Sequence, residues 1–143
     1  MLFSGTTVKF RALSHLIEGA PLHAILRPYA TAGVVIAGGS DGVRDSWNPY
    51  GMGDMLERAT LVGLRNNFRR DEEMELALDT CTYQGAKVME IADYGLDVGC
   101  TADFVILPGE TICEAVVERP ADRTVVKRGK IVARHGELAQ PIA

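Results

Sequence analysis

The hydrophobic and polar positions of the chain divide it into a helical first part and a strand-rich last part. Residues 34–37 form a short apolar, β-branched run, which predicts a strand buried on both faces. Before it, residues 21–29 predict a short helix with one apolar face, which Pro28 is expected to end or kink. A helix followed by a buried strand is the repeating unit of an α/β barrel.

Three further helices are predicted between residues 54 and 91. The first covers residues 54–66, because Asp54 is suited to cap a helix and an apolar side follows it. The second opens on residues 71–73, three acids at the end where the helix dipole favours negative charge. The third covers residues 82–91. The apolar side of the first helix is predicted to consist of Met55, Leu56, Ala59, Val62 and Leu64.

From residue 100 onwards, short apolar runs alternate with turn residues, which predicts strands. Residues 103–107 and 112–118 are each predicted as a strand, stopped by a following proline. Residues 124–127 and 130–133 flank Arg128-Gly129, a two-residue signal for a hairpin. Residues 6–13 carry a weaker strand pattern near the start of the chain.

Candidate chemistry follows the strand at residues 34–37. Gly38 and Gly39 end this strand and place Ser40 and Asp41 at its carboxyl end, where open α/β sheets and barrels carry their active sites. A carboxylate there is placed to bind a metal or to move a proton, although the same residues also serve as ordinary caps and turns. Trp47 is the only tryptophan and lies in the loop that follows.

Three stretches in chain order resemble the cytosine deaminase branch of the metal-dependent amidohydrolases. The first is S-D-G-V-R-D-S-W-N-P-Y-G-M-G-D-M-L at residues 40–56. The second, T-Y-Q-G-A-K at residues 82–87, resembles the family's Thr-x-x-Gly-Ala-x helix, and residues 93–107 resemble its Gly-x-x-x-Gly-x-x-Ala-Asp strand. The likeness runs from about residue 33 to residue 134.

The resemblance implies an α/β fold: the C-terminal portion of a TIM-type (β/α)8 barrel followed by part of a small β-sandwich. Residues 1–98 would hold the last barrel strand and its helices, and residues 99–143 the sandwich strands. Asp41 would be a metal ligand and the proton shuttle, and Trp47 would line the substrate pocket. The metal would be divalent, zinc or iron, and would activate water to hydrolyse a C–N bond of a cyclic substrate.

Most of the metal ligands that the resemblance implies are missing from the sequence. There is no His-x-His pair, and the histidines are His15, His23 and His135. A single carboxylate does not hold a transition metal, since catalytic sites usually supply three or more protein ligands. We therefore expect the chain to be the C-terminal fragment of such an enzyme, and the roles of His15 and His23 stay open.

The charge and composition of the chain limit the classes of partner that it can be expected to bind. A net charge of −4 and a pI near 5.3 give no basic surface for nucleic acid, and no apolar run is long enough to cross a membrane. The three cysteines form no Cys-x-x-Cys pair, which favours free thiols in the cytoplasm. The expected partners are a small cyclic amine or amide and either the missing N-terminal part or a second copy. The alternative is a non-catalytic module that binds a partner chain through open sheet edges.

Overall fold

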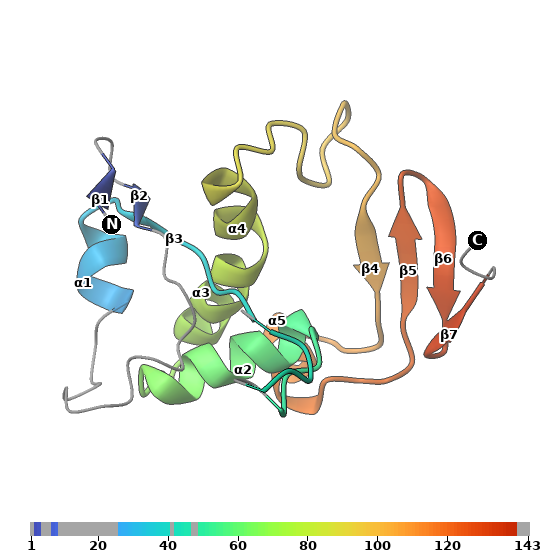
Figure 1. The fold of residues 1–143 in the computed structure, drawn as a ribbon, viewed down its shortest axis with the longest axis horizontal. Helices are drawn as coiled ribbons and strands as arrows, with labels where there is room; N and C mark the ends of the chain where they lie inside the picture. Colours follow the sequence, from blue (N-terminus) through green and yellow to red (C-terminus); the bar gives the residue numbers. More distant parts are fainter. Residues whose placement is uncertain (1, 4–6, 9–25, 41, 47–48, 140–143) are drawn as a thin grey trace.

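The structure is a computed structural model that describes residues 2–3, 7–8, 26–40, 42–46 and 49–139. It contains both helices and sheets. A three-stranded sheet lies toward one end of the molecule and a four-stranded sheet toward the other, with most of the helices between them (Figure 1). None of the described helices is long and apolar enough to cross a membrane.

The three-stranded sheet contains the strand that leads to the predicted site. Strand β1 (Leu2–Phe3) pairs antiparallel with β2 (Thr7–Val8), and β2 pairs in parallel with β3 (Val35–Ile36). Both β2 and β3 fall within runs predicted as strands. Ile36 is buried in the hydrophobic core, whereas Val35 is only partly buried, so burial on both faces of the strand is confirmed only in part.

Helix α1 (Leu26–Thr31) precedes β3, and it corrects the expected effect of Pro28. The helix continues through Pro28 to Thr31, so the prediction that Pro28 ends it is wrong. Pro28 lies in the first turn of the described helix, where a backbone N–H has no partner inside the helix and its loss costs little. The turn at Gly33, with φ of 75°, separates α1 from β3. Residues 21–25 of the predicted helix lie outside the described residues.

The three helices predicted between residues 54 and 91 are confirmed as α2 (Met55–Arg65), α3 (Asp71–Cys81) and α4 (Tyr83–Val88). Helix α2 begins at Asp54, whose Oδ1 accepts a hydrogen bond from the Leu56 N–H at 3.0 Å. The prediction is wrong for Leu64, which is 74% exposed because it lies on the outer side of α2. The buried core contains Leu26, Ile36, Leu56, Ala59, Val62, Phe68, Ala77 and Val116.

Glu73 fixes the start of α3. Its carboxylate accepts hydrogen bonds from the backbone N–H groups of Arg69 at 2.6 Å and Arg70 at 3.1 Å, and it forms an ion pair with Arg27 of α1. These bonds satisfy amide groups that have no partner within the helix. The ion pair joins α3 to α1, the helix that precedes β3.

Residues 112–118 are a helix, α5 (Ile112–Glu118), so the strand predicted there is wrong. Thr111 caps the helix by accepting from the Glu114 N–H at 3.1 Å, and the Glu114 carboxylate accepts from the Glu110 N–H at 2.6 Å. The next turn buries Ala115 and Val116 against the core. The helix is stabilised by these caps and by the packing of α5 on α2 and α3, which outweigh the strand propensity of a short apolar run.

The four-stranded sheet is antiparallel throughout, in the order β4-β5-β6-β7. The predicted hairpin is confirmed: Arg128 and Gly129 both adopt positive φ, at 50° and 73°, in a tight turn between β5 and β6. Asp103 holds this turn, because its carboxylate accepts from the Arg128 N–H at 2.6 Å and pairs with Lys127. The strands are β4 (Phe104–Ile106), β5 (Thr124–Lys127), β6 (Lys130–Arg134) and β7 (Glu137–Leu138).

Candidate functional site

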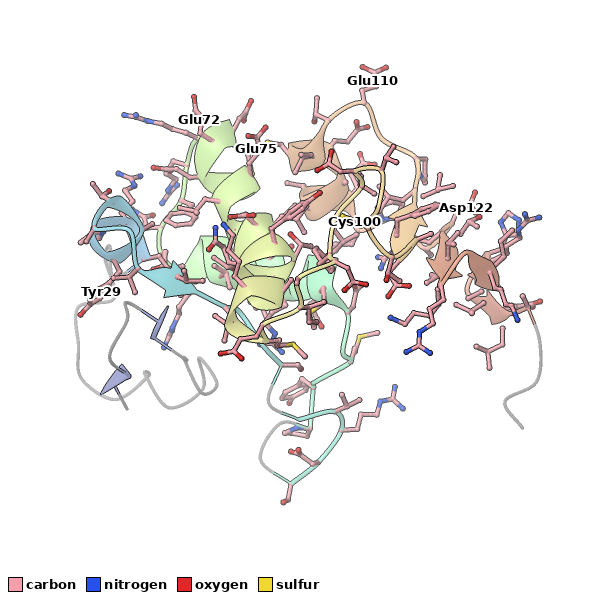
Figure 2. The ribbon with its side chains drawn as sticks, turned by 90° about the horizontal axis from the view of Figure 1, so that it is seen from above. Tyr29, Glu72, Glu75, Cys100, Glu110 and Asp122 are labelled. Atoms are coloured by element: carbon pink, nitrogen blue, oxygen red, sulfur yellow. The ribbon has the colours of Figure 1, made fainter. Side chains whose placement is uncertain are left out.

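Asp41 and Trp47, the two predicted site residues, lie outside the residues that the structure describes. Ser40 and Gly42, on either side of Asp41, are described, and they follow β3 as predicted. The loop that begins there extends away from the packed helices, on the side opposite Glu72 and Glu75 of α3 (Figure 2). The described part of the site consists of the residues that hold the end of β3.

Arg58 on α2 contacts the end of β3. Its Nη2 donates a hydrogen bond of 2.9 Å to the Ser40 hydroxyl, and that hydroxyl donates one of 3.0 Å to the carbonyl of Gly42. The Gly42 N–H in turn donates to the Ser40 carbonyl at 2.9 Å. Ser40 and Gly42 are thus tied to each other by two hydrogen bonds and to α2 by a third.

Burial makes the contact of Arg58 unusual. The residue is 9% exposed, whereas arginine is almost never fully buried unless it is paired. Within the described part of the chain it forms no ion pair, and its Nε has no hydrogen-bond partner. The sequence analysis did not single out Arg58. The signal was its spacing, four residues after the Asp54 cap and four before the buried Val62, which puts it on the inner face of α2.

Gly38 lets β3 approach the end of α3 closely. Its N–H donates to the carbonyl of Thr80 at 2.9 Å. A Cβ at this position would lie 3.0 Å from the Cys81 sulfur, 3.1 Å from the Thr80 hydroxyl and 3.3 Å from a methyl group of Val62. These distances are shorter than ordinary van der Waals contacts, so the strand could keep its position only if its neighbours moved.

We expect Gly38→Ala to destabilise the protein by about 1–2 kcal/mol, the usual effect of overpacking a filled interior. Thr80 is buried and held by a hydrogen bond to Ala77, so it has little room to move. Chemical denaturation of both proteins measures the change. Gly39→Ala is the matched control, because a Cβ at Gly39 meets nothing within 4 Å. Equal stability of the two variants would contradict the close contact.

Cys81 lies beside this contact but is poorly suited to act as a nucleophile. Burial raises the pKa of its thiol, and neither the hydrogen bond with Thr80 nor the positive charge of Arg58 offsets that rise. The thiol therefore stays protonated at neutral pH, whereas the thiolate is the reactive and metal-binding form. All three cysteines are free.

The start of α2 is fixed by an ion pair with the chain that enters the second sheet. Both carboxylate oxygens of Asp54 accept from Arg123, at 2.9 Å from Nη1 and 3.0 Å from Nη2. Burial by itself raises the pKa of Asp54, but the hydrogen bonds from Arg123 and the Leu56 N–H outweigh it and hold the pKa below its usual value. Asp54 is therefore charged at neutral pH.

The described residues contain no group of three or more histidine, cysteine or acidic side chains placed to hold a metal. His15 and His23 lie outside the described residues. His135 lies in the turn between β6 and β7, where its Nδ1 is 2.5 Å from the carboxylate of Asp122 and its side chain is 75% exposed. Asp122 points outward at the far end of the molecule from α1 (Figure 2).

A hollow of about 320 Å³ lies between the α4–β4 connection and the hairpin of the second sheet. Its polar groups bind one another, since Asp93 accepts from the Thr101 hydroxyl and Asp103 pairs with Lys127. These contacts attach the connection to the hairpin, and we assign the hollow a structural role. It is lined by Ile91, Asp93, Tyr94, Thr101, Asp103, Lys127 and Arg128.

Comparison with known proteins identifies the family. Residues 14–133 match the model of the amidohydrolase family. The chain is 32% identical over 104 residues to the N-isopropylammelide isopropyl amidohydrolase of Pseudomonas sp. (strain ADP), a match that covers 72% of this chain and 26% of that protein. The chain thus spans about a quarter of the length of this curated relative.

Two solved structures share the fold. N-isopropylammelide isopropylaminohydrolase from Burkholderia multivorans is 51% identical with a TM-score of 0.75, over 78% of this chain and 28% of that one. The 5-methylcytosine deaminase from Klebsiella pneumoniae, liganded with 5-fluorocytosine, is 24% identical with a TM-score of 0.67, over 81% and 28%. With the three sequence motifs and the family match, these likenesses show that the chain belongs to the amidohydrolase family.

Proposed function

We propose that this chain supplies the carboxyl-terminal part of a metal-dependent amidohydrolase that hydrolyses a C–N bond of a small cyclic amine or amide. The observation that carries the proposal is the 51% identity to the Burkholderia multivorans enzyme over 78% of this chain. In this proposal, residues 1–98 belong to the (β/α)8 barrel and residues 99–143 to the β-sandwich. The remaining barrel strands come from further polypeptide, and the protein acts in the cytoplasm.

Asp41 is the residue that we assign to the chemistry. In the sequence Asp41 comes five residues after the end of β3, and a carboxylate oxygen suits a divalent metal such as zinc or iron. The described residues contain no group of three or more histidine, cysteine or acidic side chains placed to hold a metal, so in this proposal further ligands come from the rest of the enzyme. When bound, a divalent metal would supply a water made acidic enough to be activated near neutral pH. Asp41 accepts the proton from the attacking water and passes it to the leaving nitrogen.

A chimera tests this function. Residues 26–134 of this chain replace the matched segment of the Burkholderia multivorans enzyme, and release of isopropylamine from N-isopropylammelide is measured. Release well above that of an Asp41→Asn chimera supports the proposal. A folded chimera that binds metal but releases neither isopropylamine from N-isopropylammelide nor ammonia from cytosine would favour a non-catalytic module instead.

We expect Trp47→Ala in the active chimera to weaken substrate binding by about 1–3 kcal/mol, the scale of stacking between a planar ring and an aromatic side chain. Stacking holds the ring both before and during the reaction, so KM should rise more than kcat falls. Steady-state kinetics separates the two constants. Trp47→Phe serves as the control that keeps an aromatic face, and an unchanged KM in Trp47→Ala would assign Trp47 to packing.

A further inference from the structure

Arg58 is a buried cation that donates to the Ser40 hydroxyl, and this hydroxyl donates in turn to the Gly42 carbonyl, so two successive hydrogen bonds link Arg58 to the residues that flank Asp41. The role proposed here for Arg58 rests on the function proposed above. We propose that Arg58 is a positioning residue, which fixes the turn after β3 through the Ser40 hydroxyl and so holds Asp41 in its working orientation. Arg58 itself touches neither substrate nor metal in this proposal.

The direction of each hydrogen bond follows from the chemistry of the groups. A guanidinium only donates, so the Ser40 oxygen must accept from Arg58 Nη2 at 2.9 Å. The single proton of the hydroxyl is then available for the Gly42 carbonyl, 3.0 Å away. Arg58 therefore fixes the rotation of the hydroxyl as well as its position. The turn closes when the Gly42 N–H donates back to the Ser40 carbonyl at 2.9 Å.

The unfavourable free energy of burying Arg58 is evidence that its contact with Ser40 has a functional role. Removing a charge from water is unfavourable unless the charge is paired and hydrogen-bonded. Arg58 is 9% exposed, and within the described residues its side chain meets a neutral hydroxyl and no carboxylate. An apolar residue would fill this position on the inner face of α2 at lower cost. A residue kept at a cost to stability is typical of functional sites.

The backbone of Arg58 is held in place by the capped first turn of α2. Its backbone N–H donates to the carbonyl of Asp54 at 3.0 Å, in the first turn of α2. The side chain of Asp54 caps that turn and binds Arg123 through both oxygens. One helical turn therefore links a fixed ion pair to the end of β3. Groups that hold a metal ligand in place without touching the metal change activity or metal affinity by about 10–100-fold when they are removed.

The first test is kinetic and uses the active chimera saturated with metal. We expect Arg58→Met to lower kcat about 10–100-fold and to change KM less than about threefold, because the substrate contacts remain while the proton acceptor is misplaced. Arg58→Lys should recover part of the loss, since it keeps a donor. Arg65→Met is the matched control, because it makes the same change on the same helix and, within the described residues, Arg65 forms no hydrogen bond or ion pair with β3. It should leave kcat unchanged.

A double variant separates positioning from a general loss of structure. If Arg58 acts through Ser40, then Ser40→Ala should lower kcat as Arg58→Met does, and the double variant should be no slower than either single variant. Multiplied effects of the two substitutions, or an Arg58→Met protein that keeps more than half of the original kcat, would overturn the proposal.

The second test needs no activity, so it distinguishes failure of this inference from failure of the proposed function. Amide hydrogen exchange is followed at Gly42 in the chain of residues 1–143 and in the chimera. Arg58→Met should speed exchange of the Gly42 amide, whose acceptor is the Ser40 carbonyl, whereas Arg65→Met should not. If the chimera is inactive, faster Gly42 exchange still supports the positioning role. Unchanged exchange in a folded Arg58→Met protein would overturn it.

Discussion

Asp41→Asn is expected to lower the turnover of the active chimera by at least about 10²–10⁴-fold, the usual contribution of a positioned proton-transfer group. The substitution keeps the size and shape of the side chain and one oxygen that can bind a metal. It removes the basic oxygen that accepts the proton. Release of amine under metal saturation gives kcat, and metal analysis of the same sample shows whether the metal is retained.

Asp97→Asn is the matched control for this result. It makes the same chemical change at an exposed residue of the connection between α4 and β4. It should leave kcat within about twofold of the unmodified chimera, since surface substitutions have small effects. If Asp41→Asn keeps activity within about tenfold of the unmodified chimera, Asp41 is not the proton shuttle. Ser40 and Asp41 would then be interpreted as ordinary cap and turn residues, the alternative raised by the sequence.

Sequence reasoning succeeded where two local signals agreed. For α2, a good capping residue at Asp54 and an apolar stripe predicted the same helix, and the structure confirms both the cap and most of the stripe. The hairpin of β5 and β6 was predictable because Arg128-Gly129 suits a turn that needs positive φ. The family was predictable because three separate motifs occur in the right order.

Prediction from the sequence failed where long-range packing decides the structure. Residues 112–118 are too short for periodicity to separate helix from strand. A capping signal was present in Thr111 and Glu114, which have the spacing of a helix start, but the apolar run masked it. In the structure, the Val116 side chain is buried in the core, and the Thr60 hydroxyl of α2 donates to the Val116 carbonyl at 2.7 Å. These contacts with the rest of the fold stabilise the helix.

In the candidate site, too, one residue could be predicted from local sequence signals and another could not. The position of Asp41 after a buried strand is visible in the sequence, because an apolar run, two glycines and a polar pair follow one another. The role proposed for Arg58 is not visible there, since a charged residue on a helix is normally on the surface. The spacing places Arg58 on the inner face of α2, but only the fold shows that its side chain is buried there and reaches Ser40.

Asp54→Ala is expected to lower the free energy of unfolding by about 2–4 kcal/mol. Loss of the helix cap contributes about 1 kcal/mol. The remainder comes from Arg123, whose side chain is 22% exposed and would lose a partner bound through two hydrogen bonds. Chemical denaturation of the chain measures the change. Asp54→Asn is the informative companion, because asparagine still caps a helix but carries no charge, so it should lose only the part due to Arg123.

The dependence on pH provides an independent check on the same pair. The folded-state pKa of Asp54 lies below its usual value, so its contribution to stability is complete above the unfolded-state pKa of about 4 and is lost as pH falls through the folded-state pKa. The difference in stability between the original chain and Asp54→Asn should therefore be constant near neutral pH and shrink below about pH 4. A double-mutant cycle with Arg123→Met isolates the pair. A coupling energy near zero at pH 7 would show that Asp54 acts as a cap alone and that the ion pair does not hold α2 against the second sheet.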